Sequence, residues 1–533
     1  MSPLLLLASV STASTGLPPG IVPPVRCGTP AFADLEMPEL VPEPLPVPRP
    51  PSSDKLERDA YDVTDNELIT ENFAFRWGTR GGVTTAEVED LAEAFEDAWL
   101  EEIHIQGHPV PTGADDYLFN VYIGDSGGGT PSGYGAAGYF TSDSRGWPMV
   151  VVAAGTLDDR DYADITAAHE FYHAIQGGTD RYPYSGDSAW FWEASATWAS
   201  ATVYPSNIYY ASFMFGYAFL PHYPVNYFNY ADSWNVEDYY QYGAFIVPLH
   251  LSEITADRDL IREVWTDSGP ESDPLSMLQS LLDDRGMSFD DAFLDHAARM
   301  ATFDYPEGDG YEMMANYYAS SFSESDNMVA DEVGPEGTDG FTAGPRSLRP
   351  YRYGYNAIEV DIGDAESIEV VIDGDEEGSR GSNATWGAKL VVVDRRDRTY
   401  VDFDWDDTTG TVSVDGLDGE TVWIVVAPWT RQTRYFDSET FEYRYSVAFG
   451  EDDPVEPGDT GDTGEPVEDT GEPVEDTDEP VASDDDTATD DTEPVDGGSG
   501  PGKATTCSTV SAAGAWTVVL GMLGAAGRRR EMR

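Results

Sequence analysis

Cysteine is almost absent from this chain of 533 residues, which contains only Cys27 and Cys507. The two lie far apart in the sequence and outside the segments that we expect to fold, so a disulfide framework is excluded and packing must supply the stability. Val25 and Arg26 precede Cys27 in place of the small residues of a lipidation site, which disfavours a lipid there.

Basic residues are also scarce, with 29 lysines and arginines against 99 acidic residues and a formal net charge of -70. A polyanion repels nucleic acid and anionic membrane surfaces, so the charge argues against both as partners. The composition favours a secreted or surface protein that stays soluble and that can bind calcium, and the length predicts two or three domains.

The stretch 167–176 contains His169-Glu170-Phe171-Tyr172-His173 in a run without proline or glycine, which predicts a helix. Histidines four residues apart lie on one face of a helix, so His169 and His173 can reach one metal ion. Glu170 lies beside them, where a general base can activate water. The alternative is that both histidines are satisfied core residues and that Glu170 is a solvated helix residue.

A second segment, 189–199, is rich in apolar residues and has one acid, Glu193, in its middle. A lone carboxylate in an apolar helix is costly unless it is paired or binds a metal. The intervening loop contains glycine and proline, so the chain can turn back and place Glu193 opposite the two histidines. Two histidines and one glutamate leave a fourth position open, as in catalytic zinc sites. The alternative is a buried acid paired with Arg181 or with a backbone donor.

Together the two motifs resemble the gluzincin metallopeptidases, the thermolysin-like group with His-Glu-x-x-His and a downstream glutamate on another helix. The sequence is similar to that of a family of secreted metalloproteases from myxobacteria and related bacteria in two patterns, Ala-Ala-His-Glu-Phe-x-His-Ala-Ile-Gln and Trp-Phe-x-Glu-Ala-x-Ala-x-Trp. This resemblance covers residues 61–321. It implies that His169, His173 and Glu193 are ligands of Zn²⁺, that Glu170 is the general base, and that the substrates are proteins or peptides.

One position departs from that resemblance. Thermolysin-like enzymes often have aspartate four residues after the third ligand, where this chain has Thr197. We therefore expect the group that orients a histidine to come from elsewhere in the chain.

A tyrosine-rich segment at 239–249 resembles the tyrosine-glycine helix start of aminopeptidase-like gluzincins. There a tyrosine hydroxyl donates to the oxyanion that forms at the attacked carbonyl. Tyr240 and Tyr242 are the candidates for this role, and the alternative is that both are packing residues. His250 is a weaker candidate for the same role.

The order of predicted elements before the motif fits a zincin catalytic half. We expect strands and one helix, in the order strand 73–77, helix 88–99 capped by threonine, and strands 117–123 and 149–152. An edge strand beside the site would bind a peptide by adding it as a further strand, and residues 137–140 or 149–151 are the candidates. Amphipathic helices over 260–300 would form the second half of the domain.

Short alternating segments with turns between them follow in residues 353–449 and predict an antiparallel β-sandwich. The predicted strands cover residues 357–362, 368–372, 389–393, 421–426 and 441–448. An acidic cluster of Asp373, Asp375, Glu376 and Glu377 is either a Ca²⁺ site or a solvated turn.

Both ends of the chain have the composition of targeting or linking segments. Residues 1–16 predict a signal peptide, which is atypical because no basic residue precedes the apolar run. Residues 17–60 predict a proline-rich linker or a pro-region. Residues 451–506 predict a disordered acidic stalk. Residues 507–533 combine a cysteine, a weakly apolar stretch and terminal arginines, which resembles the C-terminal sorting signals of myxobacteria; a plain membrane anchor is the alternative.

We therefore predict an α+β protein with a zincin-like metallopeptidase domain at 61–335 and a β-sandwich domain at 336–450. The predicted function is that of an exported, surface-displayed zinc metallopeptidase. A non-catalytic surface adhesion or binding protein with an inactive peptidase-like domain is the alternative from another class. A metal-dependent hydrolase of non-peptide substrates fits the same residues.

Overall fold

The computed structural model describes Cys27 and residues 55–63, 65–230, 235–267, 269, 271–374, 384–430 and 439–450. Contacts divide the chain into two units, residues 1–456 and 457–533, and every described residue lies in the first unit. The predicted signal peptide, acidic stalk and sorting segment lie outside the described residues. Among the helices that are described, none combines the length and the apolar character needed to cross a membrane.

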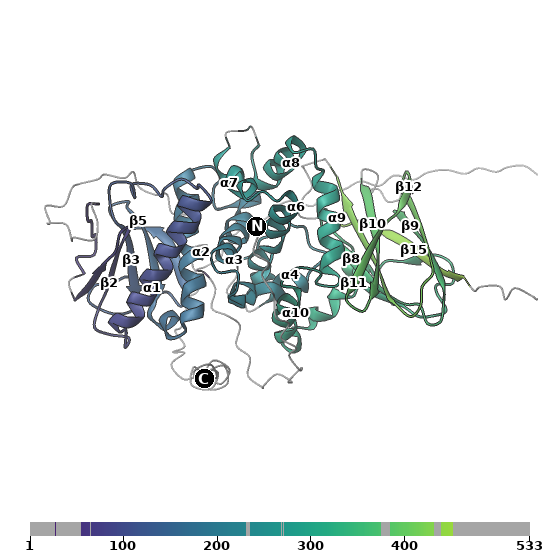
Figure 1. Cartoon of the computed structure of the whole chain (residues 1–533), viewed down its shortest axis with the longest axis horizontal. Helices are drawn as coiled ribbons and strands as arrows, with labels where there is room; N and C mark the ends of the chain where they lie inside the picture. The colour runs from purple at the N-terminus through teal and green to yellow at the C-terminus, as the bar shows by residue number, and fades with distance from the viewer. Residues whose placement is uncertain are drawn as a thin grey trace, which may run out of the picture. The chain divides into compact units, whose positions relative to one another are not determined.

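A five-stranded sheet begins the described part of the chain (Figure 1). The strands follow the order β1-β2-β3-β5-β4, with β2, β3 and β5 parallel and both edge strands antiparallel to their neighbours. Their bounds are β1 Asn66–Ile69, β2 Phe73–Trp77, β3 Phe119–Gly124, β4 Gly138–Ser142 and β5 Pro148–Ala153. The predicted strands 73–77, 117–123 and 149–152 are thus confirmed within one or two residues.

Alternating side chains give this sheet two different faces. Phe73 and Phe75 of β2 and Val121 of β3 belong to the main hydrophobic core, whereas Tyr122 and Val151 belong to a small cluster on the other face. Two helices, α1 (Thr85–Ala98) and α2 (Arg160–Thr179), cover the first face and contact each other. The sheet and α1 thereby hold α2 along its length.

Helix α1 begins as its sequence predicts. The Thr84 hydroxyl accepts a hydrogen bond from the Glu87 backbone N–H, and the Glu87 carboxylate accepts from the Thr84 backbone N–H at 2.7 Å. This reciprocal capping satisfies two backbone donors that a helix start leaves unpaired.

The middle of the chain is helical, and it packs against α2 on one side and against the following sheets on the other. The α-helices are α3 Ala189–Val203, α4 Met214–Ala218, α5 Tyr240–Gly243, α6 Ile246–Thr255, α7 Asp259–Thr266, α8 Pro274–Asp284, α9 Phe289–Met300 and α10 Gly308–Tyr317. The predicted helical region 260–300 consists of α7, α8 and α9.

Two five-stranded sheets complete the described chain and share one hydrophobic core. The first has the order β11-β10-β14-β8-β6 and the second β12-β13-β9-β15-β7. The bounds are β6 Asp331–Val333, β7 Thr342–Ala343, β8 Asn356–Asp361, β9 Ser367–Gly374, β10 Thr385–Asp394, β11 Asp397–Asp402, β12 Asp404–Asp406, β13 Thr409–Asp415, β14 Thr421–Trp429 and β15 Tyr443–Gly450. All five predicted strands are present, as β8, β9, β10, β14 and β15.

Neighbouring strands in these two sheets run antiparallel except for one pair. Strand β6, which was not predicted, pairs with β8 in a parallel direction at one edge, and the predicted strands are antiparallel to their neighbours otherwise. Helix α9 contacts β10 and β14, and alternate residues of those strands join the helical core instead of the core between the sheets.

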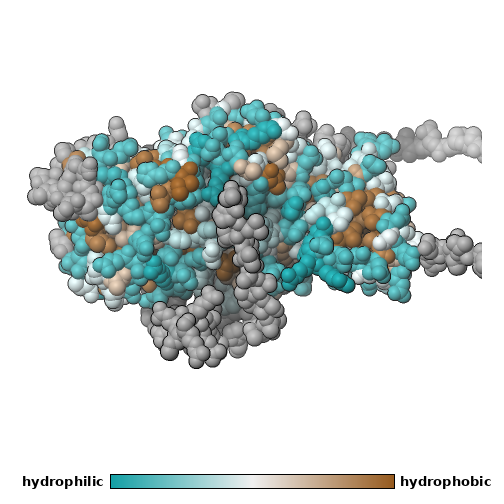
Figure 2. Space-filling view, viewed as in Figure 1, coloured by the Kyte–Doolittle hydropathy of each residue, from teal (hydrophilic) through white to brown (hydrophobic). Residues whose placement is uncertain are grey.

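The structure therefore has a β/α N-terminal region, a helical middle and two largely antiparallel sheets. Of the two segments predicted as a peptide-binding edge, 149–151 lies inside the sheet, because β5 is between β3 and β4. Only 137–140, at β4, lies at an edge. On the face shown in Figure 2, hydrophilic residues cover most of the described surface, as the acidic composition requires.

Candidate metal centre

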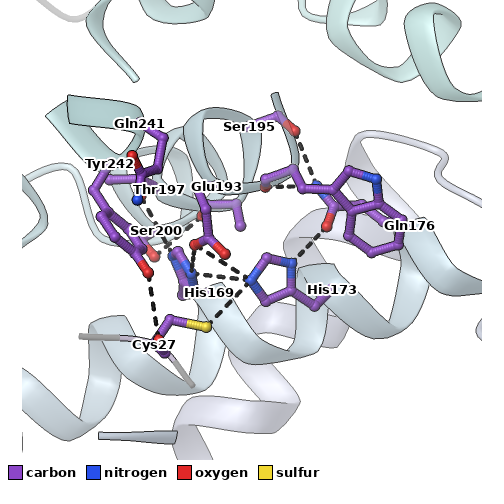
Figure 3. Close-up of polar contacts among 12 residues, drawn as sticks. Cys27, His169, His173, Gln176, Glu193, Ser195, Thr197, Ser200, Gln241 and Tyr242 are labelled. Atoms are coloured by element: carbon purple, nitrogen blue, oxygen red, sulfur yellow. Dashed lines mark hydrogen bonds and ion pairs between the residues drawn. The ribbon is translucent and has the colours of Figure 1, made fainter. Parts of the chain in front are cut away.

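Helix α2 carries the two histidines in its buried section (Figure 3). The Asp159 side chain caps its start by accepting from the Tyr162 backbone N–H. Every residue from Ile165 to Gln176 is buried, because the helix lies between the sheet, α1 and α3. The Nε2 atoms of His169 and His173 are 3.1 Å apart, so the predicted convergence of the two imidazoles is present.

Helix α3 brings Glu193 to the same point. Its Oε2 lies 3.1 Å from the Nε2 of His169 and 3.6 Å from the Nε2 of His173. The Glu193 side chain is fully buried. Arg181, the alternative partner, donates instead to the backbone carbonyl groups of Gly269 and Glu271.

Cys27 joins this group from the N-terminal segment. Its Sγ lies 3.5 Å from the Nε2 of His173, and the residue is only 6% exposed. The expectation that Cys27 lies outside the folded part is therefore wrong. The proline-rich surroundings of Cys27 have no helical or strand periodicity, so the sequence offered no signal for this contact.

Two polar side chains orient the histidines. Gln176 Oε1 lies 2.6 Å from the Nδ1 of His173, while the Gln176 amide nitrogen donates to the Trp192 carbonyl and to the Ser195 hydroxyl. Because Gln176 must accept at Oε1, the His173 Nδ1 carries the proton and its Nε2 presents a lone pair to the group.

The second orienting group lies at the position where the sequence departs from the thermolysin-like pattern. The Thr197 hydroxyl lies 3.4 Å from the Nδ1 of His169. The expectation that the orienting group comes from elsewhere in the chain therefore holds for His173, which Gln176 contacts, and not for His169. Gln176 lies three residues after His173, which places it on the same face of α2, and this spacing was the signal that could have identified it.

Tyr184 is a member of the site that the sequence did not reveal. It lies in the loop before α3, and its hydroxyl donates to the Oε1 of Glu193. Burial opposes the charge of Glu193, but His173 and His169 outweigh it and hold the pKa of that carboxyl below its ordinary value. The Glu193 carboxylate is thus kept ionised, as a metal ligand must be.

Glu170 lies next to this group and beneath the edge strand β4. It is 1% exposed, and burial raises the pKa of its carboxyl. At Gly138 of β4, an added Cβ would lie 2.9 Å from the Glu170 Cγ, so only glycine allows this approach. The general-base candidate and the candidate peptide-binding edge are therefore adjacent.

The structure places the two candidate tyrosines differently. The Tyr242 hydroxyl donates to the backbone carbonyl of Cys27 at 3.3 Å, and its ring lies 6.2 Å from that of His169. The Tyr240 hydroxyl donates to the backbone carbonyl of Pro224 at 3.1 Å. Tyr242 lines the same cavity as His169 and Glu170, whereas His250 faces Asp295, with Nε2 and Oδ2 3.3 Å apart.

The donor set fits a metal ion. Tetrahedral zinc with bonds of about 2.0 to 2.1 Å to nitrogen and oxygen places such ligand atoms about 3.3 Å apart. The separations among the nitrogen and oxygen atoms of His169, His173 and Glu193 are 3.1 to 3.6 Å. Together with Cys27 they form the one group in the described part of the chain whose three or more ligand atoms lie within 4.8 Å of one another.

The predicted calcium cluster is only partly visible. Asp373 belongs to β9 and pairs with Arg444, whose Nε lies 2.7 Å from the Asp373 carboxylate. Asp375, Glu376 and Glu377 lie outside the described residues. Calcium binding at this cluster stays a prediction.

The fold and the site define a mixed α+β protein with a buried Cys-His-His-Glu group that can hold a metal. A family model, described as a family of unknown function (DUF6055), matches residues 57–453. The chain belongs to this family. Its match spans the β/α region, the helical middle and the C-terminal sheets.

Other comparisons add no functional assignment. No curated protein matches the chain in sequence. The pre-peptidase C-terminal domain of a collagenase from Bacillus anthracis is 11% identical, with 22% of this chain and 93% of that chain covered and a TM-score of 0.15. A family GH115 4-O-methyl-alpha-glucuronidase is 9% identical, with 55% and 39% covered and a TM-score of 0.12. Likenesses this low support no shared fold or activity.

Proposed function

We propose that this protein is a zinc metallopeptidase of the gluzincin type, with a zincin-like catalytic region. The observation that carries the proposal is the convergence of His169, His173 and Glu193 with Glu170 beside them, all buried on α2 and α3. His169, His173 and Glu193 would hold the zinc ion, which would supply polarisation of a carbonyl group and a lower pKa of water. The remaining chemistry is assigned to the side chains of the chain.

Glu170 acts as the base and then as the acid in this proposal. Its carboxylate takes a proton from water as the water oxygen bonds to the carbonyl carbon of the peptide. It then passes that proton to the nitrogen of the leaving amine, while the carbon–nitrogen bond breaks. The proposal that this exchange occurs next to the edge of the sheet is supported by the close approach of Glu170 to Gly138.

Strand β4 orients the substrate. It pairs with β5 along one edge and ends the strand order of its sheet, so a peptide can add along its other edge through backbone hydrogen bonds. Such a mode of binding favours proteins and peptides in an extended conformation as substrates.

We also propose that the protein is exported and displayed at the cell surface, which is supported by the composition of both ends of the chain.

Metal content and cleavage together test the function. We expect full-length protein to bind about one zinc per chain, and we expect its Cys27→Ala variant to cleave casein. Cys27 is replaced because it belongs to the same group of possible metal ligands and would compete with water for the fourth position on the metal. Chelation should abolish cleavage, and added zinc should restore it. Failure to bind zinc would refute the site, and zinc without cleavage in the variant would favour the binding-protein alternative.

Tyr242 is assigned to the developing oxyanion. Its hydroxyl already donates to a carbonyl oxygen, that of Cys27, beside His169 and Glu170. We expect Tyr242→Phe, in the Cys27→Ala background, to lower kcat about 100-fold or more with zinc content unchanged. Tyr240→Phe is the matched control, since its hydroxyl bonds to Pro224, and its kcat should change little. Equal effects of the two substitutions would contradict the assignment.

A further inference from the structure

Cys27 meets the candidate centre through both its side chain and its backbone. Its Sγ lies 3.5 Å from the Nε2 of His173, and the residue lines the same cavity as Glu170. Its backbone carbonyl accepts from the Tyr242 hydroxyl at 3.3 Å. One residue thus touches a proposed metal ligand and the proposed oxyanion donor (Figure 3). It also shares a cavity with the proposed base, and these are the groups that a substrate must reach.

The distance from sulfur to nitrogen agrees with shared coordination. A tetrahedral zinc with a zinc–sulfur bond of about 2.3 Å and a zinc–nitrogen bond of about 2.0 to 2.1 Å places the two ligand atoms about 3.5 Å apart. The Sγ of Cys27 and the Nε2 of His173 are 3.5 Å apart. All four ligand atoms of the group lie within 4.8 Å of one another.

Little space remains beside Glu170 when Cys27 is in place. The cavity lined by Cys27, His169, Glu170 and Tyr242 has a volume of about 30 Å³. This volume suits a water molecule and not a peptide side chain. Access of a substrate to the metal therefore requires the Cys27 side chain to leave this position.

We propose that Cys27 is the fourth ligand of the metal and keeps the site closed against exogenous ligands. A catalytic zinc site leaves one position for water or substrate, whereas four protein ligands close it. The chain as it stands is then a latent form, and this rests on the proposed function for the activity that is blocked.

Cobalt spectroscopy tests the ligand without using activity. Full-length protein is loaded with Co²⁺, and its near-ultraviolet absorption is compared with that of Cys27→Ser, Cys27→Ala and Cys507→Ser. We expect a thiolate-to-cobalt charge-transfer band in wild type and in Cys507→Ser, and none in the two Cys27 variants. All four proteins should bind the same amount of metal. X-ray absorption of the zinc form should show one sulfur neighbour at about 2.3 Å in wild type.

Access to the metal tests the closure. Acetohydroxamate, a small bidentate metal ligand, should change the visible cobalt spectrum of Cys27→Ala at a concentration at least ten times lower than wild type requires. A metal-loaded wild type without the charge-transfer band, or without a sulfur neighbour, would overturn the proposal. Loss of metal from both Cys27 variants would also overturn the proposal. Cys27 would then be needed to hold the metal, as in a structural site, and could not be a ligand that leaves. If acetohydroxamate binds Cys27→Ala but casein is not cleaved, the inference stands and the peptidase function fails.

Discussion

Glu170→Gln is expected to leave zinc bound and to abolish most of the cleavage of casein. Glutamine keeps the shape of the side chain but cannot take a proton from water. General acid–base catalysis contributes about 10²- to 10⁴-fold, and we expect a loss of kcat in that range in the Cys27→Ala background. Glu170 lies beside the ligand atoms of His169 and Glu193 and is not one of them, so the zinc content should stay at about one per chain.

Two further measurements make this result decisive. Glu89→Gln is the matched control, since Glu89 is exposed on α1, and its cleavage and zinc content should equal those of the parent. Thermal unfolding should show no loss of stability for Glu170→Gln, because burial already opposes the charged carboxylate at this position. If Glu170→Gln cleaved casein at the parent rate, the proposed mechanism would be wrong.

Glu193→Gln is expected to give the opposite pattern, with loss of the metal. The substitution is chemically identical, and Glu193, like Glu170, is buried. Its Oε2, however, lies 3.1 and 3.6 Å from the two histidine Nε2 atoms, and a neutral amide is a poor zinc ligand. Since loss of an orienting partner alone costs about 10- to 100-fold in metal affinity, loss of a ligand should cost more than about 100-fold.

Competition with a chromophoric chelator measures that affinity, and cleavage should fall with zinc occupancy. In the Cys27→Ala background, excess zinc should restore part of the activity of Glu193→Gln and none of the activity of Glu170→Gln. The same glutamate-to-glutamine substitution at the two positions therefore distinguishes a metal ligand from a general base. Zinc affinity equal to that of the parent in Glu193→Gln would remove this residue from the centre.

Periodicity accounts for what could be predicted of the fold. The pattern of apolar residues indicated β2, β3, β5, β8, β9, β10, β14 and β15, and a threonine before an amphipathic segment indicated the start of α1. Strands β1, β11 and β13 were not predicted. The short strands β6, β7 and β12 were not predicted either, because two or three residues cannot establish a period. The parallel pairing of β6 with β8 was missed for the same reason.

The sequence by itself determined the part of the site that one or two neighbouring helices contain. Helical spacing brings His169, Glu170 and His173 together, and the lone acid in an apolar segment identified Glu193 as their partner. These inferences need only the geometry of a helix and the cost of burying an unpaired charge.

Only the tertiary structure decided the rest. The contact of Cys27 with His173 spans 146 positions, and that of Tyr242 with Cys27 spans 215. It also separated Tyr240 from Tyr242, which lie two residues apart on one short helix and bond to different carbonyl groups, so that only Tyr242 lines the cavity with His169. Contacts of this kind depend on how whole elements pack, and a local pattern of residues has no information about that packing.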